Sequence, residues 1–171
     1  ELQKAQYQVK NVETSELRKY PYPPFTTSTL QQAASNLFGW SAKHTMQVAQ
    51  HLYEEGLITY HRTDSLNLAG QAVTMCRDFI KKEYGVTYLP GLPKLYKTKS
   101  KVAQEAHEAI RPTDVTMQQC NNATMQRDEE RLYDLIWKRF VACQMNEAVF
   151  TQTKNFVIAR NAVTKQSPDQ N

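Results

Sequence analysis

The sequence predicts an α+β fold in which a mostly helical domain, built around a helix-turn-helix-like unit, is flanked by β-rich segments. Apolar residues recur at helical spacing between residues 28 and 80 and again between 127 and 144, whereas both flanks carry strand-like patterns. The chain has 171 residues, enough for one or two small domains with a real core. Apolar content of 40% and charged content of 22% are ordinary for a soluble globular protein.

The N-terminal flank is predicted to be a strand followed by a stiff linker. Residues 5–12 partly alternate between polar and apolar side chains, as a strand does. Pro21, Pro23 and Pro24 then exclude regular structure and favour an extended chain. We therefore place a domain boundary in this proline-rich stretch.

Two helices follow, and turn signals bound both of them. Ser28, with Gln31 three residues later, forms a capping-box pattern, and Gly39 is placed to end the first helix. Ser41 is predicted to cap the second helix, which Gly56 ends. Two short helices joined by a tight turn resemble a helix-turn-helix unit, although helical hairpins that bind no nucleic acid are at least as frequent.

The middle of the chain is predicted to hold a short strand, a third helix and a basic loop. Residues 57–60 are apolar and β-branched, which favours a strand, and Asn67 is predicted to cap a helix that Gly85 ends. Residues 86–101 combine proline, glycine and tyrosine with four lysines, which are Lys94, Lys97, Lys99 and Lys101. Such a loop suits a phosphate backbone, but a solvated surface loop fits equally well.

The last third of the chain is predicted to be helical and then extended. Residues 103–110 are helix-prone until Pro112 redirects the chain. A longer helix is predicted over 127–144, with Leu132, Leu135, Ile136, Phe140 and Cys143 as its core stripe. Strands are predicted over 148–160.

The net charge and the cysteine positions indicate which partners and metal sites to expect. The net charge of +4 favours a polyanionic partner without proving one. The 3 cysteines form no Cys-x-x-Cys pair, which argues against a structural zinc site and suits reduced thiols. No apolar run is long enough to cross a bilayer, and no signal-peptide pattern occurs. Because the chain starts without methionine and ends in polar residues, we expect a piece of a longer protein.

Tyr60 and Arg62 are the strongest candidates for chemistry. On an extended segment, residues i and i+2 point to the same face, so the phenol and the guanidinium can meet. A phenolic oxygen can attack a phosphodiester, while a guanidinium holds the phosphate and offsets its growing charge. The chain has 9 tyrosines, and most tyrosines serve packing or surface roles, so this spacing alone does not settle the function.

Four longer strings carry a resemblance to a known family. Residues 53–65 read Tyr-Glu-Glu-Gly-Leu-Ile-Thr-Tyr-His-Arg-Thr-Asp-Ser, and residues 105–114 read Glu-Ala-His-Glu-Ala-Ile-Arg-Pro-Thr-Asp. Residues 24–34, Pro-Phe-Thr-Thr-Ser-Thr-Leu-Gln-Gln-Ala-Ala, and residues 135–145, Leu-Ile-Trp-Lys-Arg-Phe-Val-Ala-Cys-Gln-Met, agree in order and distance. Together these strings resemble the type IA DNA topoisomerases, most closely the bacterial topoisomerase I group.

The resemblance implies a domain organisation. Residues 26–112 would form the mainly helical domain III, which carries the catalytic tyrosine. Residues 1–25 would be a linker and the first part of the β-rich arch domain II, and residues 113–171 its returning part, a helix followed by strands. The Toprim domain and the rest of the arch would lie outside this chain.

The resemblance also implies a reaction. Tyr60 would cleave one DNA strand by transesterification, forming a 5′-phosphotyrosine, and strand passage with religation would relax negative supercoils without ATP. The fragment alone is expected to be inactive. Mg²⁺ is expected in the Toprim domain of the full enzyme and no metal in this chain. Expected partners are single-stranded and negatively supercoiled DNA and the missing domains of the same polypeptide, in the cytoplasm at the nucleoid and away from any membrane.

The resemblance further assigns residues to the site. Tyr60 would be the nucleophile, Arg62 the clamp on the scissile phosphate, and His107 a second catalytic group beside it. A lone histidine is more often structural, and only its place in the string favours His107. The expected DNA-binding residues are Thr59, Thr63, Asp64, Ser65, Glu108, Arg111, Lys97 and Lys99.

Several of these residues have a plainer alternative. Arg111 suits a backbone contact or a structural ion pair better than catalysis, and Asp64 and Glu108 are either orienting groups or ordinary surface carboxylates. His61 would point to the opposite face of an extended segment, and we assign it no role. His44 and His51 are expected on the surface of the second helix.

Two other functions remain open from the sequence. The first is a non-catalytic DNA-binding module, built on the helix-turn-helix-like pair and the lysine-rich loop. The second is a protein-interaction domain of a larger assembly. Both differ from the enzyme in giving the Tyr60 hydroxyl no chemical part.

Overall fold

The computed structural model describes residues 6–96, 107–117 and 125–160, which fall into two compact units. One unit takes in the described residues up to 19 and from 148 onward, and the other spans 20–147. Helices and strands are both present, so the predicted α+β class is confirmed. The division into domains II and III at residues 25 and 112 concerns the longer protein and stays a prediction.

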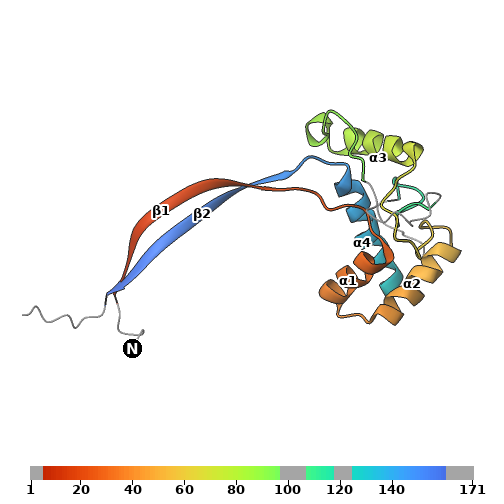
Figure 1. Ribbon diagram of the computed structural model, residues 1–171, viewed down its shortest axis with the longest axis horizontal. Coiled ribbons are helices and arrows are strands. Elements are labelled where there is room, and N and C mark those ends of the chain that lie inside the picture. Colours follow the sequence, from red (N-terminus) through yellow and green to blue (C-terminus); the bar gives the residue numbers. More distant parts are fainter. Residues whose placement is uncertain (1–5, 97–106, 118–124, 161–171) are drawn as a thin grey trace, which may run out of the picture. The chain divides into compact units, whose positions relative to one another are not determined.

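The first unit is a two-stranded antiparallel ribbon. Strand β1 (Gln6–Lys19) pairs with β2 (Ala148–Arg160) along its whole length, as Figure 1 shows. The register places Lys19 opposite Ala148, and it shifts once, between Val9 and Asn11. Both predicted strands are therefore confirmed, although β1 continues well beyond residue 12.

The second unit is mainly helical. Its described α-helices are α1 (Thr27–Phe38), α2 (Ala42–Glu54), α3 (Gly70–Glu83) and α4 (Arg127–Cys143), with a short 3-10 helix η2 (Val86–Tyr88) after α3. Helix α4 packs against both α2 and α3, and α1 packs against α2. None of the helices in the described part of the chain is long and apolar enough to cross a membrane.

The core forms where α4 meets the other helices. The predicted stripe on α4 is buried at four of its positions, while Leu135 is only partly covered. The ring of Phe79 on α3 meets the ring of Trp137 edge to face, at 5.7 Å between centroids. Helix α3 adds Cys76, and burial raises the pKa of this thiol and raises that of Cys143 to about 12, so both stay neutral.

Helix α1 begins with a different cap from the predicted one. The Thr26 hydroxyl accepts a hydrogen bond from the Thr29 N–H at 3.3 Å, and the Thr29 hydroxyl accepts from the Thr26 N–H at 2.9 Å. Thr26 has an extended backbone, whereas Ser28 already lies in the first turn, so only Thr26 can serve as the cap. Gly39, at φ 73°, ends α1 as predicted, and Ser41 caps α2 as predicted.

The predicted strand at residues 57–60 is wrong. In this stretch only Ile58 forms a β-bridge, opposite Pro112, and neither side extends into a strand. The ladder stops because the Arg111 N–H, which would continue it, donates to the Thr59 hydroxyl and not to the Thr59 carbonyl. Tyr60 therefore lies in an irregular loop and not at the end of a strand.

Two helix predictions also need correction. Helix α3 begins at Gly70 with Ala69 as its N-cap, because the Asn67 backbone is already bound on both sides: its N–H donates to the Ser65 hydroxyl and its carbonyl accepts from Ala109. Residues 107–110 are extended and not helical, because their backbone pairs with Phe25 and Asn67. The preceding residues 103–106 lie outside the described residues.

The cap assignment can be tested by substitution. Thr26→Ala removes one half of the reciprocal cap and is expected to lower the free energy of unfolding by about 0.5–2 kcal/mol. Ser28→Ala is the matched control, with an expected change below about 0.5 kcal/mol. Urea titration followed by circular dichroism measures both. Equal losses for the two variants would contradict the assignment.

Candidate active site

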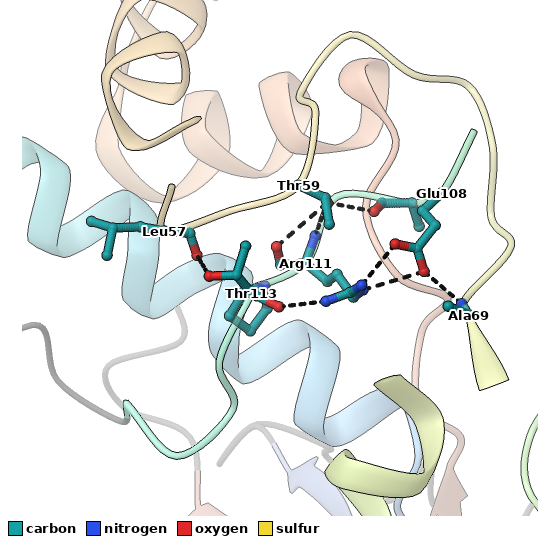
Figure 2. Close-up of polar contacts among 8 residues, drawn as sticks. Leu57, Thr59, Ala69, Glu108, Arg111 and Thr113 are labelled. Atoms are coloured by element: carbon teal, nitrogen blue, oxygen red, sulfur yellow. Dashed lines mark hydrogen bonds and ion pairs between the residues drawn. The ribbon is translucent and has the colours of Figure 1, made fainter. Parts of the chain in front are cut away.

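Two chain segments that are far apart in the sequence are paired at the base of the site. The Thr59 N–H donates to the Arg111 carbonyl at 2.9 Å, and the Thr59 hydroxyl donates to the Ala109 carbonyl at 2.8 Å and accepts from the Arg111 N–H at 3.0 Å. The Thr113 N–H donates to the Leu57 carbonyl at 3.0 Å. Figure 2 shows these contacts side by side. The Thr59 hydroxyl is thus occupied by its own chain.

Arg111 and Glu108 form an ion pair beside this junction. An Arg111 Nη atom lies 2.7 Å from a Glu108 carboxylate oxygen, and the guanidinium also donates to the Pro112 carbonyl at 3.0 Å (Figure 2). Glu108 in addition accepts the Ala69 N–H at the start of α3. The side chains are 15% and 29% exposed, so the pair is mostly covered. Of the two plainer roles predicted for Arg111, the structure shows the ion pair.

The Tyr60 phenol follows directly after the junction and is 44% exposed. Its ring packs against those of Tyr53 and His61, at centroid distances of 5.3 and 5.4 Å. The ring of His107 stands perpendicular to it at 6.3 Å. Two of the three predicted catalytic side chains are therefore neighbours, and the phenol can be reached from solvent.

Arg62 and His107 line one open cavity of about 550 Å³. The other residues that line it are Thr27, Ser28, Gln31, Thr63 and Asp64. The lining groups are the Arg62 guanidinium, the His107 imidazole, the Gln31 amide and several hydroxyls. Asp64 is the one carboxylate among the lining residues. Such a set suits an anionic ligand.

Thr27, at the start of α1, forms hydrogen bonds with the loop that carries Tyr60 and Arg62. The Thr27 N–H donates to the Thr63 carbonyl at 2.9 Å, its hydroxyl donates to the His61 carbonyl at 2.8 Å, and it accepts the Thr63 N–H at 2.9 Å. The Thr63 hydroxyl accepts from the Ser65 N–H, and both side chains are buried. These hydroxyls shape the loop, and their predicted contacts with DNA stay predictions.

The sequence prediction overlooked three residues of this cavity. Ser28 and Gln31 are predicted only as a helix start and Thr27 has no predicted role, although all three lie within the 24–34 string that carries the resemblance. Lys97 and Lys99, predicted to bind DNA, lie outside the described residues.

His61 is buried and lies on the face of its segment opposite Tyr60 and Arg62. Its side chain is 0% exposed and is packed with the rings of Tyr53 and Tyr60. Burial alternates from Tyr60 to Ser65, so His61 lies on the inner face and Tyr60 and Arg62 on the outer one, as predicted. Burial lowers the pKa of His61, with a further lowering by the neighbouring Arg62 cation.

The two histidines of α2, His44 and His51, lie at the surface, as predicted, and pair with the start of α4. His44 contacts Asp128 at 2.8 Å and His51 contacts Glu129 at 3.3 Å, and both histidine side chains are substantially exposed. No group of three or more His, Cys, Asp or Glu side chains in the described ranges could hold a metal ion.

Comparisons with known proteins agree on one family. The sequence pattern of the DNA topoisomerase family matches residues 1–168. DNA topoisomerase 1 of Pseudomonas aeruginosa is 52% identical over 92% of this chain, and that of Escherichia coli is 49% identical over 89%. The chain spans only 18% of the length of each of these relatives.

A solved structure agrees in three dimensions as well. Full-length topoisomerase I from Thermotoga maritima matches with a TM-score of 0.68 and 28% sequence identity. The match covers 96% of this chain and 31% of that one.

The ion pair below the site gives a test of its structural role. Glu108→Gln leaves the covered Arg111 guanidinium without its charge partner, so we expect the free energy of unfolding to fall by about 1–3 kcal/mol. The control is Glu83→Gln, which breaks the solvent-exposed pair with Lys82 and is expected to cost less than about 1 kcal/mol. Thermal unfolding monitored by calorimetry compares the two. A Glu108 variant as stable as the control would rule out this role.

Proposed function

Because this chain belongs to the bacterial DNA topoisomerase family, we propose that it is the nucleophile-bearing part of a type IA enzyme in which Tyr60 cuts one DNA strand. The observation that carries the proposal is the setting of the phenol. Tyr60 is half-exposed, its ring stands against His107, and His107 shares an anion-suited cavity with Arg62. Arg62 and His107, from two distant strings, thus line a space that a phosphodiester can enter, and the Tyr60 ring adjoins this space through His107.

The reaction proposed is an exchange of esters. The Tyr60 oxygen gives up its proton and attacks the phosphorus, the new O–P bond forms, and the bond from phosphorus to the 3′ oxygen breaks. The 3′ oxygen leaves and takes up a proton, while the 5′-phosphate stays joined to Tyr60. Reversal of the same step reseals the strand, and because the ester bond is kept, no ATP is needed.

Arg62 and His107 have distinct parts in this proposal. Arg62 is a fixed cation that holds the scissile phosphate and stabilises the charge that grows on its oxygens in the transition state. His107, at the edge of the Tyr60 ring, would donate a hydrogen bond to the same phosphate. Thr27 and Ser28 line the same cavity from the start of α1 and would meet the adjoining DNA backbone.

The rest of the machinery is proposed to lie in the longer protein. The ribbon β1–β2 leaves many apolar side chains half-exposed, among them Val12, Phe150 and Phe156, which suits a strand pair that forms part of a larger arch. Mg²⁺ would bind in another domain. The substrate would be single-stranded or negatively supercoiled DNA in the bacterial cytoplasm, and the chain by itself would not relax DNA.

Tyr60→Phe tests the central claim in the complete protein. Loss of the hydroxyl is expected to abolish the covalent DNA adduct, while DNA affinity changes by less than about 3-fold, because the ring is kept. Tyr84→Phe is the control, because this tyrosine of the same unit is 42% exposed and is expected to change nothing. Adducts are measured with end-labelled single-stranded DNA on denaturing gels. A Tyr60→Phe protein that still forms adducts would favour a non-catalytic DNA-binding module.

Substitution of Arg62 tests the clamp. Arg62→Ala is expected to slow cleavage by about 10²–10³-fold, and Arg62→Lys by less, because lysine keeps the charge and loses the planar fork. Arg127→Ala, at an exposed arginine on α4, serves as the control. Single-turnover cleavage rates at saturating DNA give the comparison. Equal rates for Arg62→Ala and the wild type would remove Arg62 from the reaction.

A further inference from the structure

His61 occupies an unusual place beside the nucleophile. Its imidazole is completely buried, with ring centroids 5.8 Å from Tyr53 and 5.4 Å from Tyr60. Among the described residues, neither its Nδ1 nor its Nε2 has a hydrogen-bond partner. The Tyr60 ring therefore packs against Tyr53 of helix α2 and His61 of its own loop, with His107 standing edge to face at 6.3 Å.

A histidine is a poor choice for packing alone at this position. One ring nitrogen carries a proton and the other a lone pair, and both lose contact with water when they are buried without a partner. An apolar side chain of similar size would fill the same space without that loss. The imidazole thus adds a property that packing does not require, and this property is its ability to gain a proton.

The groups around His61 disfavour the charged ring. Tyr53 and Glu54 face it from α2, Tyr60 and Arg62 come from its own loop, and Thr27 of α1 binds only its backbone carbonyl. Burial and the Arg62 cation both act against the imidazolium and lower its pKa, and only Glu54 acts in its favour. The ring is therefore neutral in neutral solution.

We propose that His61 is a positioning residue, which together with Tyr53 forms an aromatic seat that holds the Tyr60 phenol in its direction of attack and opens when His61 gains a proton. The proposal rests on the function proposed above. An imidazolium cannot stay buried beside Arg62 without a partner, so it has to move towards solvent or Glu54. The Tyr60 ring then loses the His61 ring, one of the rings that hold it, and attack on phosphorus slows because alignment is lost.

The expected change of the cleavage rate with pH follows from the linkage between proton binding and opening of the aromatic seat. A histidine whose pKa is lowered in the folded protein binds fewer protons there than in an open state, so acid favours opening. The closed seat is fully stable above the ordinary histidine pKa of about 6.5 and loses stability as the pH falls below it. Cleavage should therefore weaken on the acid side.

Two variants of the complete protein distinguish the effect of the aromatic surface of His61 from the effect of its protonation. His61→Phe keeps an aromatic surface and cannot titrate, so it should cleave within about 3-fold of the wild-type rate near pH 8 and lack the acid-side loss that His61 causes. His61→Ala removes the surface, so it should cleave about 10-fold more slowly over the whole range. Its DNA affinity should be unchanged. His51→Phe, at an exposed histidine of α2, is the control and should keep the wild-type profile.

The measurement is the single-turnover rate of adduct formation between about pH 5.5 and 8.5, with thermal melting to confirm folding. The inference is overturned if His61→Phe keeps the whole acid-side loss, or if folded His61→Ala cleaves like the wild type. If His61→Ala does not fold, the profile of His61→Phe still decides. A Tyr60→Phe protein that cleaves would instead end the proposed function, whereas an inactive Tyr60→Phe with unaltered His61 variants would end only this inference.

Discussion

The backbone pairing between residues 57–59 and 109–113 is the interaction on which the site depends. The Thr59 N–H donates to the Arg111 carbonyl and the Thr59 hydroxyl accepts the Arg111 N–H, so both peptide groups of Arg111 are paired, as covered peptide groups must be in a folded chain. The pairing joins segments that lie about fifty residues apart in the sequence. Because Tyr60 follows one segment and His107 precedes the other, the same hydrogen bonds bring the phenol and the imidazole together.

A second set of hydrogen bonds fixes the other end of the loop that carries Tyr60 and Arg62. Thr27 uses its N–H and its hydroxyl to hold His61 and Thr63 against the start of α1. The loop that carries Tyr60 and Arg62 is thus tied down on both sides, although it has no regular secondary structure. A phenol on such a loop keeps a limited set of orientations, as an in-line attack requires.

Residues of the same type have different roles here because they differ in burial. Arg111 is mostly covered and neutralised by Glu108, so its charge serves the structure, whereas Arg62 is exposed and lines the cavity. The two histidines next to Tyr60 differ in the same way. His61 is enclosed and neutral, while His107 is partly exposed and faces the cavity. Residue type sets the available chemistry, and surroundings select which residue is free to use it.

The sequence by itself determined the end of α1 at Gly39, the start of α2 at Ser41 and the extent of α4, because caps and helical spacing depend on contacts within a few residues. Its polar and apolar alternation also located both ribbon strands, and with them the α+β class, although their pairing joins residues as distant as Gln6 and Arg160. Its motifs also identified Tyr60 and His107, which the structure makes neighbours. Only the tertiary structure decided that residues 57–60 form a loop and that His61 is enclosed. Both outcomes depend on partners far along the chain, and no local pattern contains that information.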